Sequence, residues 1–156
     1  MKLLDRRIQE LCDRVGVETF KASVKEVMDY AEIKARAVIS SLKDGVYTFS
    51  DYLEGMGQNE VVYLQCTLTI RGDEAEVDFT GSDPQAQASF NFVTTGKSHP
   101  FLALALTNYM QTVEPTIPIN GGMQRPIKTH APLGTLMNAA FPAAMGNRWE
   151  IGRAHV

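Results

Sequence analysis

The sequence predicts an α+β fold, and three features of the chain support that prediction. Apolar residues recur at helical spacing as far as Leu42, and from Val62 the period changes to the strict alternation of a β-strand. All seven prolines lie at or after Pro84, so the second half is expected to be rich in loops. We therefore expect an N-terminal helical pair, an antiparallel sheet built on a β-hairpin, one further helix and a loop-rich C-terminal part.

The first helix is predicted from apolar residues three or four positions apart, namely Leu4, Ile8, Leu11 and Val15. Gly16 is expected to end it, because glycine adopts the left-handed conformation of a helix C-terminus at little cost. A second helix is predicted over residues 17–42, with one continuous apolar face. That face comprises Phe20, Val24, Val27, Met28, Ala31, Ala35, Val38, Ile39 and Leu42.

Three strands are predicted after the second helix. A short strand is expected over residues 46–52, followed by a polar turn that contains Gly55, Gly57, Gln58 and Asn59. Residues 62–70 and 75–79 alternate strictly on either side of a turn at residues 71–74, which predicts a β-hairpin. The predicted inward-facing side chains are Val62, Leu64, Cys66, Leu68, Ile70, Ala75, Val77 and Phe79.

Beyond Gly81 the predicted elements are short. Residues 89–93 are expected to form a strand, and residues 100–110 an apolar helix with Pro100 in its first turn. Another short strand is expected over residues 126–130, within an otherwise irregular stretch.

Composition excludes several classes of protein. The chain is 44% apolar and has a net charge of −3 with no basic cluster, so we expect no nucleic-acid partner. The longest near-apolar run, residues 101–106, is much shorter than the roughly 20 residues of a membrane span, so we expect no membrane association. No secretory signal pattern opens the chain, and Cys12 and Cys66 are expected to be small core residues rather than reactive thiols. A reducing, cytoplasmic compartment follows.

Two familiar kinds of site are rejected. Residues 94–98 resemble the end of a phosphate-binding loop, but Asn91 occupies the position of its first glycine and Pro100 removes a backbone donor. His99, His130 and His155 have no metal-ligand spacing, so we expect neither a metal site nor a bound cofactor in this chain. No catalytic triad is proposed, because no serine has the Gly-x-Ser-x-Gly context.

A polar row is predicted at the end of the hairpin. Asp78 and Thr80 share one face of the strand, and Ser82 continues that face if the strand persists past Gly81. Such a row can bind a polar substrate or a subunit. The alternative, which the residues alone favour, is a turn in which Ser82 and Asp83 bond their own backbone.

A second polar cluster contains Asn120 and Arg125. Arg125 can bind a carboxylate through two parallel hydrogen bonds, and the Asn-Gly-Gly run that starts at Asn120 permits a tight turn. The alternative is a turn anchored by an arginine salt bridge. Catalytic residues remain unknown, and Asp78, Thr80, Ser82, Asn120 and Arg125 are the candidate site residues.

The order of these motifs resembles that of the hydantoinase B family, which includes the C-terminal half of oxoprolinase and the related subunit of acetone and acetophenone carboxylases. The resemblance runs from about Leu11 to Trp149. The matching motifs are Met28-x-Tyr30-Ala31-Glu32, Asp44-Gly45-x-Tyr47, Val77-Asp78-Phe79-Thr80-Gly81-Ser82-x-Pro84-Gln85, Asn91, Pro118-x-Asn120-x-Gly122, Arg125-Pro126-Ile127, Ala131-Pro132-x-Gly134-Thr135, Asn138 and Pro142-Ala143-Ala144. The chain departs from the family pattern at Ala88, where glycine is usual nearby, and at Ala139, where proline is usual.

The resemblance implies a subunit of an ATP-dependent cyclic amidohydrolase of the hydantoinase or 5-oxoprolinase type, acting with a hydantoinase A-type partner on a small cyclic amide. It places ATP on the partner and the family's divalent-metal motif outside this segment. The alternatives are a subunit of an ATP-dependent ketone carboxylase and, for the isolated chain, a non-catalytic scaffold or subunit-interface segment.

The resemblance also implies that the chain is a fragment of a larger fold. We expect residues 1–149 to be an internal fragment of a hydantoinase B-type domain, helical over 1–43 and sheet-rich over 44–149. Residues 150–156 do not resemble the family and match the translation of a common sequencing adapter. We expect them to be a non-native tail.

Overall fold

A computed structural model describes residues 2–54, 61–96 and 98–145 of the chain. The turn expected at residues 55–59 and the tail expected at residues 150–156 lie outside this range. The described part is an α+β structure with a four-stranded sheet, as the sequence predicts.

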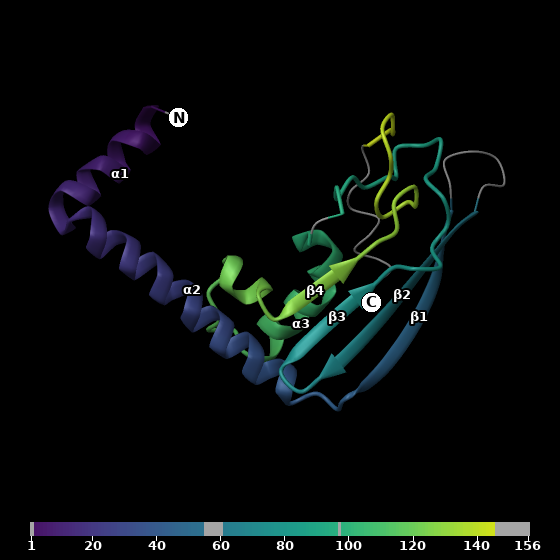
Figure 1. Cartoon of the computed structure of the whole chain (residues 1–156), viewed down its shortest axis with the longest axis horizontal. Coiled ribbons are helices and arrows are strands. Elements are labelled where there is room, and N and C mark those ends of the chain that lie inside the picture. The colour runs from purple at the N-terminus through teal and green to yellow at the C-terminus, as the bar shows by residue number, and fades with distance from the viewer. Residues whose placement is uncertain (1, 55–60, 97, 146–156) are drawn as a thin grey trace.

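The predicted helical pair is confirmed. Helix α1 covers Lys2–Val15 and α2 covers Val17–Ser40. Gly16 separates them with a φ of 86°, and its N–H donates to the carbonyl of Cys12 at 2.8 Å. The two helices form a bent arm that extends away from the sheet (Figure 1). Neither these nor the other described helices are long and apolar enough to cross a membrane.

The sheet contains β1 (Gly45–Glu54), β2 (Val61–Arg71), β3 (Glu74–Asp78) and β4 (Ile127–His130), side by side in that order. The β2–β3 hairpin is confirmed, with Arg71 paired to Glu74 and Gly72 in the turn at a φ of 61°. The first three strands are antiparallel. β4 corresponds to the strand expected at residues 126–130, but it pairs parallel to β3, so the sheet is mixed.

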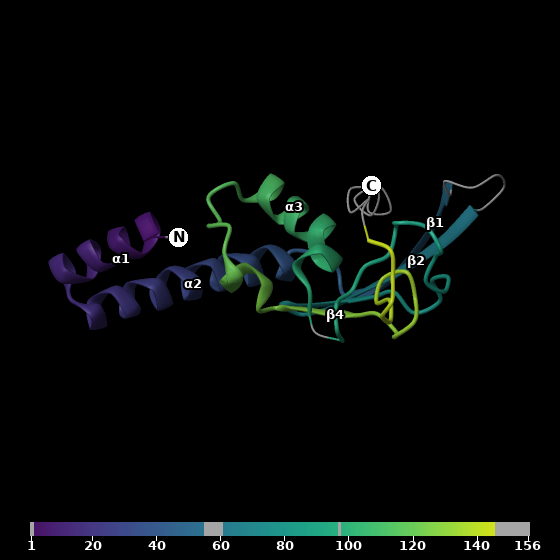
Figure 2. The same ribbon diagram turned by 90° about the horizontal axis from the view of Figure 1, so that it is seen from above.

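The core lies on one face of the sheet. The predicted alternation is confirmed, since Leu64, Ile70, Val77 and Phe79 are each at most 3% exposed. The C-terminal half of α2 and the segment formed by a 3₁₀ turn, η1 (Pro100–Ala103), and helix α3 (Leu104–Val113) lie over this face. Figure 2 shows α3 above the sheet and α1 far from it. A second 3₁₀ turn, η2 (Gly121–Gln124), packs against α2.

The structure corrects three expectations. Residues 89–93 form no strand; Phe90 makes one isolated bridge to Met145, because this stretch bonds to loops rather than to a neighbouring strand. The helix expected at residues 100–110 begins as 3₁₀ and becomes α-helical at Leu104. Cys12 is not a core residue, because no described side chain of α1 is buried, whereas Cys66 packs against the core.

Candidate functional site

The predicted polar row begins with a local turn at the end of β3. One carboxylate oxygen of Asp78 accepts hydrogen bonds from the backbone N–H of Thr80 at 2.8 Å and from its hydroxyl at 2.7 Å. This is the hydrogen bonding of an Asx turn, which ends a strand by giving the backbone a side-chain partner. Asp78 and Thr80 are therefore brought together, as their shared face predicts.

Ser82 does not continue the row, because β3 ends before Gly81. Its hydroxyl accepts from the N–H of Gln65 and donates to the carbonyl of the same residue, both at 3.1 Å. Ser82 is 8% exposed and faces β2 rather than solvent. Gly81 has a φ of 99°, and a Cβ there would lie 2.9 Å from the Gln65 side chain, so the bend requires glycine.

Asp83 continues the pairing with β2. Its carboxylate accepts from the N–H of Tyr63 at 2.7 Å, and its own N–H donates to the Tyr63 carbonyl at 3.0 Å. The strand does end in a turn, as the alternative interpretation predicts, but the side chains of Ser82 and Asp83 bond the backbone of β2 and not their own. Ser82 and Asp83 thus provide hydrogen-bond partners for the backbone N–H and C=O groups of β2 beyond the end of β3. Without them, a longer β3 would be needed to pair with these groups.

The second polar cluster joins the η2 turn to α2. Asn120 accepts from the N–H of Gly122 at 2.8 Å and donates to the carbonyl of Val27 at 3.4 Å. A Cβ on Gly122 would lie only 1.9 Å from the carbonyl oxygen of Met28. Only glycine therefore allows the backbone of η2 to approach α2 this closely.

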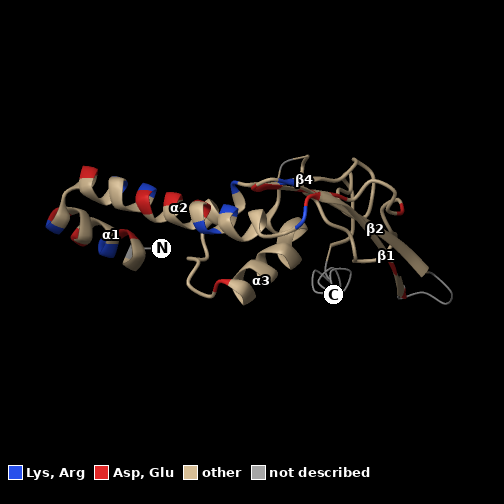
Figure 3. Cartoon of the chain, turned by 90° about the horizontal axis from the view of Figure 1, so that it is seen from below, with Lys and Arg blue, Asp and Glu red and all other residues tan. Residues whose placement is uncertain are grey.

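Arg125 completes this contact through two carboxylates of α2. Its Nη1 lies 2.7 Å from Asp29 Oδ1 and 3.0 Å from Glu32 Oε2. The pKa of Asp29 is lowered by hydrogen bonds from Lys25 and then Arg125, and the pKa of Glu32 by hydrogen bonds from Arg125 and then Arg36. The geometry is that of a turn anchored by an arginine salt bridge. Figure 3 shows charges of both signs along this side of α2.

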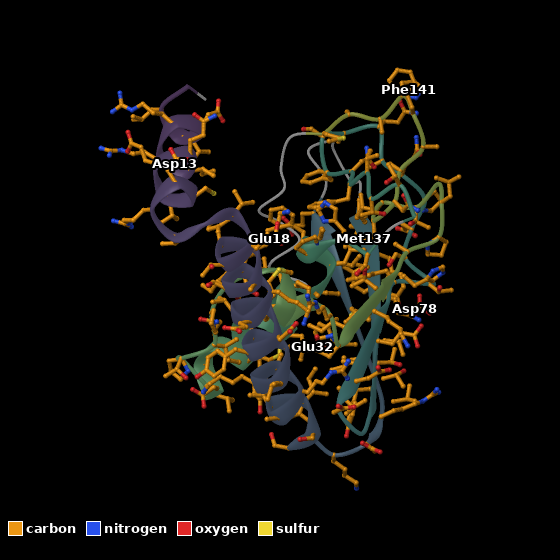
Figure 4. All side chains as sticks on the ribbon, turned by 60° about the vertical axis from the view of Figure 1, so that its left-hand side comes forward. Asp13, Glu18, Glu32, Asp78, Met137 and Phe141 are labelled. Carbon is orange, nitrogen blue, oxygen red and sulfur yellow. The ribbon has the colours of Figure 1, made fainter. Side chains whose placement is uncertain are left out.

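The two clusters do not converge. Asp78 pairs with His130 at one end of β4, while Arg125 lies just before the other end, which begins at Ile127. Four residues of strand span roughly 13 Å at about 3.3 Å per residue. Figure 4 shows Asp78 and Glu32 well apart on the sheet and on α2. The functional roles of Asp78, Thr80, Ser82, Asn120 and Arg125 remain predictions.

Buried asparagines organise the irregular C-terminal part. Asn91 is 2% exposed, and its amide makes four hydrogen bonds to the backbone of Ala86, Ala88 and Ala144. One of them joins two loops that are 53 residues apart in sequence. Periodicity carries no signal for such a residue; its place in the family motif is the signal that identifies it.

Asn138 has a similar position with one difference. Its Nδ2 donates to the carbonyl of Ala131 at 2.9 Å, but its buried Oδ1 accepts no hydrogen bond within the described residues. At the neighbouring Ala139 the resemblance described above leads us to expect proline. Its N–H donates to the carbonyl of Phe92 at 2.6 Å, a bond that proline is unable to make.

Two hollows flank α3. The first, about 290 Å³, lies between α3 and β2 and is almost wholly apolar. Burial raises the pKa of the Cys66 thiol in its wall to about 11, so this thiol is protonated and unreactive at neutral pH. The second, about 370 Å³, lies between α3 and η2 and has the amides of Asn108, Gln111 and Gln124 among its lining side chains.

Within residues 2–54, 61–96 and 98–145, no three histidine, cysteine, aspartate or glutamate side chains gather in a way that would hold a metal ion. The stretch that resembles a phosphate-binding loop has Thr95 and Gly96 at φ values of 55° and 70°, and Lys97 lies outside the described residues. His99 instead packs its ring against Phe92 and Phe101.

The sequence and the fold of this chain are both similar to those of known proteins. The model of the hydantoinase B/oxoprolinase family matches residues 1–156. The chain belongs to this family. The crystal structure of the ATP-dependent caprolactamase from Pseudomonas jessenii matches it with a TM-score of 0.72 and 30% identity, over 94% of this chain and 25% of that chain.

Sequence comparison finds relatives that are subunits of enzymes of this kind. The chain is 32% identical to the B subunit of a putative D-/L-hydantoinase of Pseudomonas sp. over 96% of its own length and 26% of that protein. It is 36% identical to the beta subunit of the P. jessenii caprolactamase over 89% of its length and 23% of that protein. This chain thus spans about a quarter of the length of these relatives.

The family motifs acquire physical roles in this structure. Asn120, Gly122 and Arg125 fasten η2 to α2, and Ser82 extends the pairing of β2. Asn91 and Asn138 hold loops together. Each of these motif residues has a structural contact that accounts for it.

Proposed function

We propose that this chain is part of a hydantoinase B-type subunit of an ATP-dependent enzyme that opens small cyclic amides. The observation that carries the proposal is the similarity to the ATP-dependent caprolactamase, which extends over 94% of the chain at 30% identity. A caprolactamase opens a lactam ring, and a hydantoinase opens a ring that contains the same amide group. The shared chemistry is hydrolysis of an amide that is held in a ring.

We further propose a hydantoinase A-type partner that carries ATP, with the divalent metal bound outside this segment. The relatives support a multi-subunit enzyme, because their names describe them as the B subunit of one enzyme and the beta subunit of the other. The side chains present here do not fit a metal centre, since no suitable group of ligands occurs in the described ranges. No step of the reaction is therefore assigned to metal or nucleotide on this chain.

The role we assign to the chain itself is that of a scaffold and interface segment. All five candidate site residues use their polar groups in contacts within the chain, at the end of β3 or between η2 and α2. They form two separate structural clusters and present no shared cavity. Both cysteines are free thiols, which supports the cytoplasm as the compartment.

A ketone carboxylase is the second candidate. The acetophenone carboxylase delta subunit of Aromatoleum aromaticum is 32% identical over 74% of this chain. ATP serves both chemistries, because it converts an unreactive oxygen into a phosphorylated one. The substrates differ, since ring opening consumes water and carboxylation consumes bicarbonate.

The test is an ATP turnover assay on the full-length subunit purified with its partner. We expect ADP formation that depends on caprolactam, hydantoin or 5-oxoproline. ADP formation that requires both acetophenone and bicarbonate would assign the carboxylase instead. Absence of substrate-dependent turnover with every one of these compounds would refute both assignments.

A further inference from the structure

The inner face of the sheet is incompletely covered. At one end of this face Leu53 and Val62 are 7% and 8% exposed, and at the other end Ile70 is 1% exposed. Between these regions Tyr47 and Phe49 are 47% and 53% exposed. The middle of β1 therefore presents two aromatic side chains with little covering them.

The register places these aromatics on the core side. Tyr47 lies opposite Leu68 and Phe49 opposite Cys66, and directly paired residues project to the same face of a sheet. Leu68 and Cys66 belong to the inward-facing set that packs against the core. The exposed aromatics thus extend the core face and do not belong to the polar outer face.

The apolar hollow of about 290 Å³ continues this open surface toward α3. Its walls come from β2, β3, η1 and α3 and from Leu42, two residues beyond the end of α2. The wall residues are Leu42, Cys66, Leu68, Val77, Leu102, Ala103, Ala105, Leu106 and Tyr109. We call Tyr47, Phe49 and this hollow the β1–β2 window.

The dimensions of the window fit a helix. Four strands about 4.8 Å apart give a sheet roughly 14 Å wide between its outer strands. A helix with its side chains is about 10 Å across, so no single helix covers the width of the sheet, and the C-terminal half of α2 together with α3 leaves Tyr47 and Phe49 of β1 exposed. The small side chains of Ala103 and Ala105 line the hollow and leave room for close helix packing.

The length of the relatives indicates where such a helix comes from. The matched stretch is 25% of the caprolactamase chain and 26% of the hydantoinase relative, so most of each relative lies outside it. We propose that the β1–β2 window is an internal interface of the full-length subunit, covered by an amphipathic helix from the polypeptide beyond this segment. This rests on the proposal that the chain is part of a larger subunit.

The test compares one substitution in two settings. Phe49→Asp places a charge in the window, and Val46→Asp is the matched control on the outer face of the same strand, where Val46 is 66% exposed. In the 156-residue chain, both variants should melt within about 2 °C of the parent chain, because both sites are open to solvent. Phe49→Asp alone should reduce binding of the apolar dye ANS.

In the full-length subunit the two variants should differ in melting temperature. Phe49→Asp should lower the melting temperature by about 5 °C or more, because its charge would be buried against the covering helix, while Val46→Asp stays neutral. Equal tolerance of both variants in the full-length subunit would overturn the proposal. A gene that encodes no polypeptide beyond this segment would also overturn the proposal.

The same variants distinguish two other possible occupants of the β1–β2 window, a second copy of the chain and a small apolar molecule. A 156-residue chain that is a stable dimer and becomes monomeric with Phe49→Asp would assign the window to a second copy and overturn the proposal. Quenching of ANS binding by a small apolar molecule in the full-length subunit would show that the window is open there, with the same consequence. Activity with cyclic amides is measured separately, so failure here leaves the proposed function standing.

Discussion

The two halves of α2 carry the same amphipathic pattern in different surroundings. Over residues 17–30 no side chain is buried, and Val24 and Val27 are 44% and 50% exposed. Over residues 31–40 the helix contributes Ala35 and Ile39, both 0% exposed, to the core. Amphipathic periodicity therefore identifies a face that can be buried, and tertiary contacts decide how much of that face is buried.

The ion pairs of the two halves differ in the same way. Lys21 and Lys25 pair only with carboxylates of the same helix within the described residues. In the C-terminal half, Arg36 also reaches Asp73 at the hairpin turn. As far as Lys25 the exposed half thus forms ion pairs only within its own helix, each worth a few tenths of a kcal/mol. Asp29 near its end also pairs with Arg125, and the packed half is joined to the rest of the fold.

The largest expected effect comes from truncating the packed half. Ile39→Ala should lower the free energy of unfolding by about 3 kcal/mol, because it leaves a cavity in the core. Val24→Ala is the matched change in the exposed half and should stay within about 0.5 kcal/mol. Urea denaturation of both variants gives the two values. Equal losses would show that the exposed half is packed in solution.

The boundary between the halves depends on Gly122. Gly122→Ala should destabilise the chain by about 2–3 kcal/mol, since the new methyl group meets the backbone of α2 at Met28. Gly121→Ala is the control, because a Cβ there would meet only the flexible end of the Met28 side chain, at 3.4 Å. If thermal denaturation shows the same loss for both, the close approach of η2 to α2 is incorrect.

A similar contrast between buried and exposed groups exists at the end of β3. Ser82→Ala should lower the free energy of unfolding by about 1–2 kcal/mol, because Gln65 loses a buried partner for both backbone groups. Asp78→Ala should lose about 0.5–1 kcal/mol, because it removes a more exposed turn. In the full-length enzyme, a large loss of turnover by Asp78→Ala at an unchanged melting temperature would instead support a functional polar row.

The smallest effect is a dependence of stability on pH. The folded-state pKa values of Asp29 and Glu32 are lowered, so their ionised forms stabilise the fold above the ordinary carboxyl pKa of about 4. This contribution is lost as the pH falls through the lowered values. In Arg125→Gln, melting temperatures measured from about pH 7 to pH 3 should fall less steeply than in the parent chain.

Arg71→Gln provides the control for that experiment. It removes the same charge from a residue that forms no ion pair within the described part of the chain. A parallel change of slope in both variants would mean that net charge, rather than the Arg125 contact, determines the acid sensitivity.

Local pattern predicted the helical pair, the hairpin and the inward face of β2, because these depend on residues close in sequence. It did not predict that β4 lies parallel to β3, since nothing in residues 126–130 specifies a partner so distant in the chain. The candidate residues were found as polar motifs. Their contacts were not predictable: Arg125 pairs with a carboxylate 96 positions earlier, and Ser82 bonds a strand 17 positions earlier.

The parallel pairing of β4 has a consequence for the order of folding. Strands β1, β2 and β3 are joined by short connections and can form from nearby contacts. β4 reaches β3 only after residues 79–126 have been drawn into a closed loop, which carries an entropic cost. We therefore expect the three-stranded meander to form first, and η1, α3 and η2 to become fixed when β4 pairs with it, as the slower step.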